Sequence, residues 1–229
     1  MMIKGLQKSS LIDYPPYVSV VVFTSGCNFR CGFCHNPGLV NGEGEDISEE
    51  EVFELLDKRK KWIDAVVITG GEPCLQKDLV EFISKVRERG FKVKLDTNGS
   101  FPDVLEDIIK RRLVDYIAMD IKSSPENYSK SAGVDIDIEK IKKSIDMIRK
   151  SGVEYEFRTT VIPGLTGLKE VVSISKMIKG ADKYVIQNFR NSEDMIDNRF
   201  KEVDPFSKEE LLDMEKAVKD KFEKIEIRD

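Results

Sequence analysis

Three of the four cysteines in this chain lie within eight residues, in the sequence Cys-Asn-Phe-Arg-Cys-Gly-Phe-Cys from Cys27 to Cys34. Thiolates held this closely on one loop are typical ligands of iron–sulfur clusters and of zinc. A closed structural site of either kind uses four protein ligands, whereas this cysteine motif supplies three: Cys27, Cys31 and Cys34. We therefore interpret the motif as a cluster site with one open iron, which is free to bind and reduce a substrate.

Other uses of these thiols fit the sequence less well. A disulfide framework is not favoured, because the N-terminus lacks the apolar stretch of an export signal and the fourth cysteine, Cys74, is distant in sequence. A zinc site would need His35 or Cys74 as its fourth ligand, but His35 directly follows Cys34 and adjacent residues are not the usual zinc spacing. Cys74 itself is expected to be a small buried residue.

The composition is that of a large globular protein. The 229 residues are 40% hydrophobic and 34% charged, and no repeat or linker divides them, so we expect a single domain over residues 1–229. The net charge of −5 offers no basic surface for nucleic acid or an anionic membrane, and the longest apolar run, residues 18–23, is too short to span a bilayer. Reduced thiols and the lack of an export signal predict a cytoplasmic protein.

Short β-branched segments alternate with amphipathic segments of helical period along nearly the whole chain. The sequence predicts strands at residues 18–23, 65–69, 92–95, 116–119, 155–161 and 183–187, with a further short strand at 225–227. It predicts helices at residues 49–60, 75–89, 102–112, 137–150, 168–178 and 208–220. Two of these helices begin with a capping box, Ser48 with Glu51 and Ser207 with Glu210.

Six strand–helix units in alternation indicate a parallel sheet with right-handed crossovers. Because the closed barrel of this type has eight units, we expect an α/β fold in which about six β/α units form an open, partial TIM-like barrel. A flat doubly wound sheet is the alternative. In both architectures the loops after the carboxyl ends of the strands carry the functional site.

Polar motifs follow one predicted strand after another. They are the cysteine motif, Thr-Gly-Gly-Glu-Pro from Thr69, Asp-Thr-Asn-Gly from Asp96, Asp-Ile-Lys from Asp120, Arg-Thr-Thr from Arg158 and Gln-Asn-Phe from Gln187. Any one of them could be turn chemistry alone. Their convergence on one edge of one sheet predicts a shared site.

Glycine and acidic residues of these motifs offer contacts to a ligand. Gly70 and Gly71 would let a ligand approach the backbone closely, and Glu72 offers a carboxylate to a ligand ammonium. An ordinary strand–helix turn is the alternative for the two glycines. Asp96 and Asp120 could share a cation or contact ribose hydroxyls, or they could simply cap helices.

Basic and aromatic residues offer a second kind of contact. Lys122 and Arg158 bring positive charge to the same edge, and an arginine can bind a carboxylate through two parallel hydrogen bonds. Phe33 lies between two cysteines, where it could stack on an adenine or pack the loop down. His35, the only histidine, either lines the site or ends the loop.

The cysteine motif, the Gly-Gly-Glu-Pro segment and the six-unit β/α pattern together resemble the radical S-adenosylmethionine (SAM) superfamily, over essentially the whole chain. The resemblance implies that Cys27, Cys31 and Cys34 hold a 4Fe–4S cluster whose open iron is chelated by the methionine portion of SAM. It also implies that an electron from the reduced cluster cleaves SAM to methionine and a 5′-deoxyadenosyl radical, which abstracts hydrogen from the substrate. The protein sets distances and excludes water, while the cofactor does the chemistry.

The resemblance assigns further roles to the motif residues. It places at the cofactor Phe33, Cys34, His35, Gly70, Gly71, Glu72, Asn98, Asp120, Lys122, Arg158 and Gln187. Residues 70–72 would hold the methionine ammonium, residues 33–35 would line the adenine, and Arg158 would face the methionine carboxylate. A monovalent cation site matches Asp96, Thr97 and Asp120. No side chain is expected to act as an acid or base.

Two further segments narrow the resemblance to the branch that activates glycyl-radical enzymes. They are residues 5–15, Gly-Leu-Gln-Lys-Ser-Ser-Leu-Ile-Asp-Tyr-Pro, and the run Val-Phe-Thr-Ser-Gly-Cys-Asn-Phe-Arg-Cys with the later Cys-His-Asn-Pro. Within that branch they resemble the activating proteins of anaerobic ribonucleoside-triphosphate reductases, which place a radical on a backbone glycine of a large partner. The partner is then expected to be an anaerobic ribonucleotide reductase, which two long connectors, residues 123–134 and 188–204, would contact. The alternative is that the two connectors are flexible linkers. An external donor such as ferredoxin or flavodoxin would supply the electron, because the chain lacks a cysteine-rich insert.

Two other functions remain open at this point. One keeps the radical chemistry but acts on a small molecule, such as a precursor of 7-deazapurines. The other is a non-catalytic electron carrier with a cluster. A carrier normally saturates its cluster with protein ligands and needs no β/α body of this size, which favours an enzyme.

Overall fold

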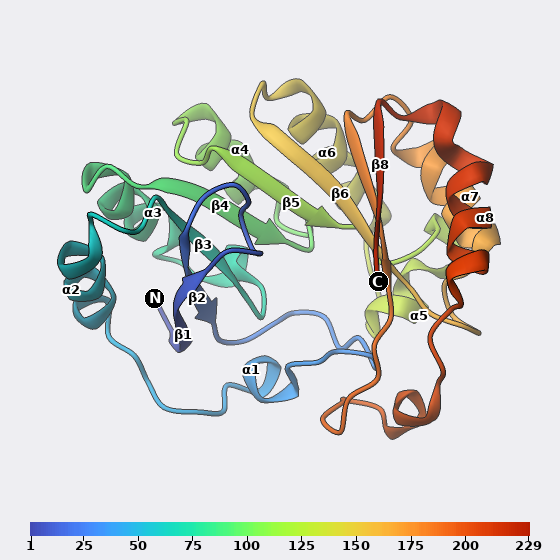
Figure 1. Ribbon diagram of the computed structural model, residues 1–229, viewed down its shortest axis with the longest axis horizontal. Helices are drawn as coiled ribbons and strands as arrows, with labels where there is room; N and C mark the ends of the chain where they lie inside the picture. Colours follow the sequence, from blue (N-terminus) through green and yellow to red (C-terminus); the bar gives the residue numbers. More distant parts are fainter. The chain divides into compact units, whose positions relative to one another are not determined.

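The computed structural model describes residues 1–229 and contains eight β-strands and eight α-helices (Figure 1). The strands are β1 (Ile3–Ser10), β2 (Ser19–Thr24), β3 (Ala65–Gly70), β4 (Lys92–Thr97), β5 (Tyr116–Asp120), β6 (Glu154–Val161), β7 (Lys183–Asn188) and β8 (Lys224–Arg228). The helices are α1 (Pro37–Asn41), α2 (Glu49–Arg59), α3 (Leu79–Glu88), α4 (Pro102–Lys110), α5 (Tyr128–Ala132), α6 (Ile138–Lys150), α7 (Leu168–Met177) and α8 (Lys208–Val218). Four short 3-10 helices complete the elements: η1 (Pro73–Leu75), η2 (Pro125–Asn127), η3 (Asn198–Glu202) and η4 (Lys219–Lys221).

The strands form one sheet in the order β1-β2-β3-β4-β5-β6-β7-β8. The pairs β2–β3, β3–β4, β6–β7 and β7–β8 are parallel. Because β1 and β8 stand at opposite ends of this order, the sheet does not close on itself. Each strand from β2 to β7 is followed by at least one α-helix, so the expected open α/β sheet of six units is confirmed.

The structure corrects the sequence-based prediction at three places. Strand β1 was not expected, and it adds an antiparallel edge to the sheet by pairing with β2. The helix expected from residue 75 is two elements, η1 and then α3, because Gln76 adopts an extended conformation between them. The two short helices α1 and α5 were not expected, since each is only five residues long and lacks a periodic pattern.

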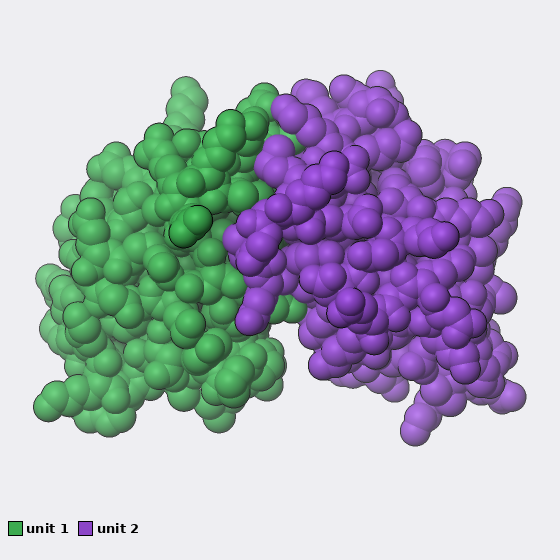
Figure 2. Space-filling model, turned by 90° about the horizontal axis from the view of Figure 1, so that it is seen from above, with its two compact units in different colours: residues 1–28, 38–97, 101–117 green, residues 29–37, 98–100, 118–229 purple.

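The chain divides into two compact units (Figure 2). Unit 1 comprises residues 1–28, 38–97 and 101–117, and unit 2 comprises residues 29–37, 98–100 and 118–229. Neither unit is a contiguous segment, and the division passes through the cysteine motif and through β5. Each unit is described below by itself.

Unit 1 is built around the central part of its strands. Residues 20–22 of β2 and 65–68 of β3 are fully or almost fully buried, as expected for parallel strands covered on both faces. On one face α2 contributes Val52 and Leu56, and α3 contributes Phe82 and Val86. A cluster of Tyr14, Val21, Ala65 and Val67 forms a further part of the core, with Tyr17, Phe23 and Tyr116 packed against it.

Unit 2 has its own core. The buried stripe Ile141, Ile145 and Ile148 of α6 follows the helical period, and Phe157 of β6 and Tyr184 of β7 are fully buried. Helices α7 and α8 pack against each other beside the last strands (Figure 1). No helix of the structure combines the length and the apolar character that crossing a bilayer would require.

Candidate functional site

All four cysteines are reduced thiols in the structure. Cys31 is buried, while Cys27 and Cys34 are half-buried. The fourth, Cys74, is buried in unit 1, where its sulfur lies 3.6 Å from the hydroxyl of Thr97. Burial and the neighbouring Glu72 raise the pKa of Cys74, which keeps it a neutral thiol. The structure therefore gives Cys74 the small buried role that the sequence suggested.

No three or more histidine, cysteine, aspartate or glutamate side chains are grouped so that they could bind one metal ion. An iron–sulfur cluster makes a different demand, because each cysteine binds a different iron and the ligand sulfurs are spread around the cluster. The donor set of the motif, three thiols with a fourth position left open, fits such a cluster in its chemistry.

Residues 29–35, the cysteine loop, carry Cys31 and Cys34 and are anchored within unit 2 by the connector that contains α5. The backbone N–H of Arg30 donates a hydrogen bond to the carbonyl oxygen of Ala132, at 2.8 Å. Gly133 follows in a left-handed conformation, with φ of 69°, and a Cβ atom there would overlap the carbonyl of Arg30. This close fit explains why a glycine ends α5.

Phe33 and His35 flank Cys34 and lie against aromatic residues of unit 2. Phe33 is only 5% exposed, and its ring centroid lies 6.0 Å from that of Phe200. The ring of His35 lies 6.1 Å from that of Phe189. Burial and the charge of Arg190 lower the pKa of His35, which favours the neutral imidazole.

The Gly-Gly-Glu turn after β3 is packed tightly against its own chain in unit 1. A Cβ atom on Gly70, whose φ is 112°, would lie 2.5 Å from the backbone N and O of Thr24, and one on Gly71 would overlap the carbonyl of Gly26. Gly71 and Glu72 donate backbone hydrogen bonds of 2.9 and 2.8 Å to the carbonyls of Thr24 and Gly26. The two glycines are thus required by the approach of residues 24–26, which lead directly into Cys27.

The carboxylate of Glu72 is buried, with 1% exposure, and is bonded within unit 1. Its Oε1 accepts hydrogen bonds from the backbone N–H of Cys74, at 3.0 Å, and from the hydroxyl of Thr97, at 2.8 Å. The first of these caps η1. Glu72 therefore ties the turn after β3 to the end of β4.

The Asp-Thr-Asn-Gly motif ends β4 with residues in different environments. In unit 1, the ammonium of Lys94 lies 3.5 Å from Asp96 and also donates to the carbonyl of Asp13. In unit 2, Asn98 is buried and its Oδ1 accepts hydrogen bonds from the N–H and the hydroxyl of Ser100, at 2.9 and 2.6 Å. The amide oxygen of Asn98 thus shapes the turn that follows the strand.

The charged residues at the end of β5 form one network in unit 2. Asp120 Oδ1 accepts a hydrogen bond from Arg158 Nε at 2.8 Å, and its Oδ2 accepts one from Lys122 Nζ at 3.1 Å. Burial alone would raise the pKa of Asp120, but the charges of Arg158 and Lys122 outweigh it and hold that pKa far below its usual range. Lys122, despite its burial, has a raised pKa because Asp120 and Cys31 attract its charge. All three therefore remain charged.

A second ion-pair network continues along β6, β7 and β8. Both carboxylate oxygens of the buried Glu156 accept hydrogen bonds from the guanidinium of Arg228, at 2.9 and 2.8 Å, and Lys183 lies 2.8 Å from the same carboxylate. Gln187 stands beside Arg228 in the register of β7 and β8 and is half-buried. The end of β7 thus lies next to a charged surface.

Sequence reasoning found the cysteines and the strand-end motifs, and it missed the residues that hold the cysteine loop. The missed residues are Gly32, Gly133 and Phe200. Phe189 belongs to the Gln-Asn-Phe motif, but its contact with His35 was not predicted. One signal could have pointed to Phe200: it is the only aromatic residue within the polar run 190–204. A lone aromatic in such a run indicates an anchor to the body of the protein.

The sequence is similar to a known family and to proteins named for their activity. Residues 21–175 match the model of the radical SAM superfamily. A protein of Methanocaldococcus jannaschii described as a glycyl-radical enzyme activating enzyme is 37% identical over 99% of this chain and 95% of its own length. The pyruvate formate-lyase-activating enzyme of Clostridium pasteurianum is 28% identical over 96% of this chain and 98% of its own.

Two solved structures share the fold. SuiB of Streptococcus suis, in a crystal structure with bound S-adenosylmethionine, aligns with a TM-score of 0.69 at 15% identity, over 91% of this chain and 50% of its own. A domain of the pyruvate-formate lyase-activating enzyme of Bacteroides vulgatus aligns with a TM-score of 0.54 at 17% identity, over 71% of this chain and 98% of its own. At these identities the likeness shows the fold alone.

Proposed function

This chain belongs to the radical SAM superfamily and to its glycyl-radical enzyme activating branch, and we propose that it installs a radical on a backbone glycine of a partner enzyme. The observation that carries the proposal is the set of three thiols close together in sequence, Cys27, Cys31 and Cys34, while burial and Glu72 keep the fourth, Cys74, a neutral thiol. A three-cysteine set leaves one iron of a 4Fe–4S cluster for SAM. When bound, the cluster supplies the electron that cleaves SAM and so provides the species that abstracts hydrogen.

The residues of the chain fit that cofactor pair in their chemistry. We propose Cys27, Cys31 and Cys34 as the cluster ligands. The backbone of the Gly-Gly-Glu turn and Glu72 would hold the methionine ammonium. Asn98 and Gln187 would contribute amide groups at the ends of their strands.

The remaining proposed contacts come from unit 2. Arg158 would face the methionine carboxylate of SAM while its Nε holds Asp120, and Phe33 and His35 would line the adenine. A monovalent cation is a further candidate ligand of Asp96, Thr97 and Asp120. The two units would act together as a single radical SAM domain, which is supported by the interleaving of their chain segments.

Within the proposed reaction the protein has to position the reacting groups and to exclude water. The glycine Cα of the partner must come within about 3–3.5 Å of the reacting carbon. We propose an anaerobic ribonucleotide reductase as the partner, on the resemblance of residues 5–15, and ferredoxin or flavodoxin in the cytoplasm as the electron donor.

The test is to reconstitute the cluster without oxygen and add reductant, SAM and the host's anaerobic ribonucleotide reductase. Electron paramagnetic resonance should then show a glycyl-radical doublet on the reductase. The variant Cys31→Ala should give neither the doublet nor 5′-deoxyadenosine, whereas the matched control Cys74→Ala should keep both.

The outcomes separate the parts of the proposal. Production of 5′-deoxyadenosine without a doublet would remove the reductase as partner and point to another glycyl-radical enzyme or to a small-molecule substrate. A reconstituted cluster that cleaves no SAM would overturn the activity itself.

A further inference from the structure

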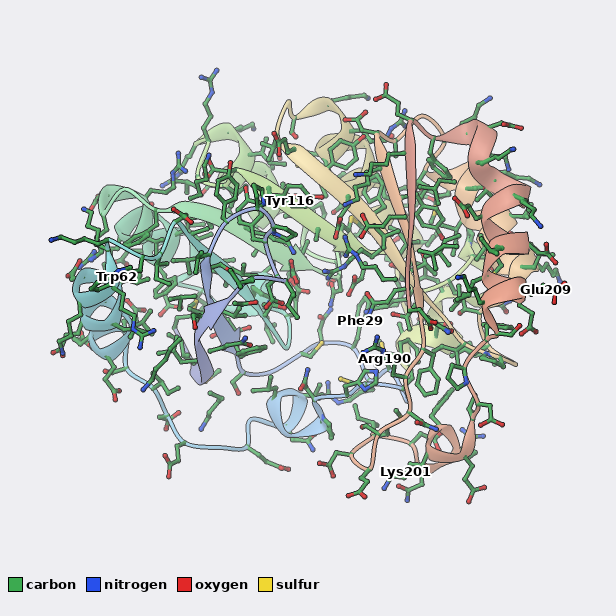
Figure 3. All side chains as sticks on the ribbon, viewed as in Figure 1. Phe29, Trp62, Tyr116, Arg190, Lys201 and Glu209 are labelled. Atoms are coloured by element: carbon green, nitrogen blue, oxygen red, sulfur yellow. The ribbon has the colours of Figure 1, made fainter.

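The connector between β7 and α8, residues 188–204, lies against the cysteine loop within unit 2, and we refer to it as the strap. It contains η3 (Asn198–Glu202), and the backbone N–H of Asp197 donates a hydrogen bond to the carbonyl of Gly32 at 2.9 Å. Figure 3 labels Phe29 at the start of the cysteine loop, Arg190 near the start of the strap and Lys201 within η3. The strap therefore contacts the loop at the residue that directly follows Cys31.

Gly32 is required by the strap. A Cβ atom at this position would lie 2.7 Å from Cε2 of Phe200 and 3.0 Å from Cβ of Asp197. Both distances are too short for carbon atoms without movement of the strap. The backbone of Gly32 is outside the left-handed region, so an alanine would be acceptable there if the strap were absent. The absence of a side chain at residue 32 thus reflects its contact with Phe200.

Aromatic rings continue the contact on both sides of Cys34. The ring of Phe200 lies 6.0 Å from Phe33 and 6.3 Å from Phe189, and Phe189 lies 6.1 Å from His35. Aromatic pairs at these separations attract one another beyond the burial of their area. Phe200 therefore joins residues that come before and after Cys34.

The cysteine loop has little regular structure of its own. Its internal backbone hydrogen bond runs from the N–H of Cys34 to the carbonyl of Cys31, at 3.0 Å. On one side it is held by Ala132 and Gly133, and on the other by the strap. Because ordering each loop residue costs conformational entropy, such a loop keeps one conformation only when neighbouring elements hold it.

We propose that Phe200 is a positioning residue for the iron–sulfur cluster and that it packs against Gly32. Through this contact the strap keeps Cys31 and Cys34 in the arrangement that binds iron. This inference rests on the proposed function, which makes the two cysteines cluster ligands. It adds a requirement that the cysteine motif does not contain: Phe200, far along the chain, must contact the cysteine loop for the cluster to be held firmly.

The test measures how fast a chelator removes iron from the reconstituted protein without oxygen, in the wild type and in variants. Gly32→Ala and Phe200→Ala should each release iron roughly tenfold faster, the scale of effect seen when residues that orient metal ligands are changed. The reduced-cluster resonance of both variants should be altered. Phe200→Tyr, which keeps the ring, should behave as the wild type. Gly38→Ala is the matched control, since a Cβ there meets nothing closer than 3.6 Å.

The double variant Gly32→Ala with Phe200→Ala tests the contact itself. Removing the ring takes away the closer of the two clashes and leaves the one with Cβ of Asp197, at 3.0 Å, so the double variant should release iron at nearly the rate of Phe200→Ala alone. If the increase in the iron-release rate of the double variant equals the product of the increases in the two single variants, the two residues act separately and the proposed contact is overturned. Wild-type rates in both single variants would overturn the positioning role while leaving the proposed function intact. Failure of the wild type to hold any cluster would overturn both.

Discussion

The candidate residues of the two units are fixed in different ways. Unit 1 presents the Gly-Gly-Glu turn, whose position is fixed by backbone atoms of residues 24–26 that approach within hydrogen-bond distance. Unit 2 presents charged side chains, Asp120, Lys122 and Arg158, which are fixed by one another. The first arrangement depends on the absence of side chains, and the second depends on their charge.

This difference determines how each part responds to change. A backbone contact without spare volume cannot accept even a methyl group, because neither side can rotate away. A network of ion pairs responds instead to protonation and to the removal of one partner. We therefore expect steric sensitivity in unit 1 and pH sensitivity in unit 2.

The largest effect is expected for Gly71→Ala in unit 1. The added Cβ would overlap the carbonyl oxygen of Gly26, and the variant should lose about 4 kcal/mol of unfolding free energy or fail to accumulate as folded protein. Chemical denaturation measures the loss. Gly38→Ala serves again as the control and should lose little. A Gly71→Ala protein of wild-type stability would show that residues 24–26 can move, and the proposed rigidity of the Gly-Gly-Glu turn in unit 1 would be wrong.

A smaller effect, with a distinctive dependence on pH, is expected for Glu156→Gln in unit 2. Burial raises the pKa of Glu156, but its hydrogen bonds with Arg228 and Lys183 outweigh this and lower the pKa from 4.5 to about 2. A carboxyl group with a depressed pKa stabilises the folded state above its unfolded pKa and loses that contribution as the pH falls through its folded pKa. The stabilisation, about 3 kcal/mol, should be complete above pH 4.5 and disappear towards pH 2.

The measurement is the difference in unfolding free energy between the wild type and Glu156→Gln as a function of pH. That difference should be large at neutral pH and shrink between pH 4.5 and 2. Glu54→Gln removes an exposed partner of Lys58 and is the matched control, for which no such trend is expected. A difference that is independent of pH would mean that Glu156 acts through its shape alone.

The smallest effect is expected for Thr97→Val, which asks whether a side-chain hydrogen bond also matters in unit 1. The change removes the hydroxyl that donates to Glu72 Oε1 at 2.8 Å while keeping the volume, and should cost about 2 kcal/mol because a buried carboxylate loses a donor. Thr97→Ser keeps the donor and should be closer to the wild type in thermal unfolding. If Thr97→Val is as stable as the wild type, the backbone contacts alone hold the Gly-Gly-Glu turn of unit 1 in place.

Much of the fold could be predicted from the sequence because local signals agreed with the final structure. Continuous apolar runs such as residues 65–68 marked the buried strands, and the capping boxes at Ser48 and Ser207 are both present. The antiparallel strand β1 escaped prediction because residues 3–10 show neither a long apolar run nor strict alternation. Its pairing with β2 is a tertiary contact that no local pattern encodes.

The candidate site was only partly predictable, for a related reason. The cysteines, the glycines after β3 and the charged residues after β5 stand next to strand ends, where parallel topology places functional groups. The partners of these residues could not be predicted. The Gly-Gly turn contacts Gly26, the cysteine loop contacts Ala132, and Asp120 is paired with Arg158 across 38 positions of sequence. Such pairs depend on how the chain returns to itself.

The contact between Gly32 and Phe200 also has an evolutionary consequence. The three-cysteine pattern alone places no restriction on residue 32. Substitutions at residue 32 should therefore be tolerated in relatives that lack an aromatic ring at residue 200. Relatives that carry a bulkier residue at 32 are then expected to carry a smaller one at 200, and the two positions should change together. Correlated substitutions at residues 32 and 200 among relatives would reflect the same steric contact that holds the cysteine loop in this molecule.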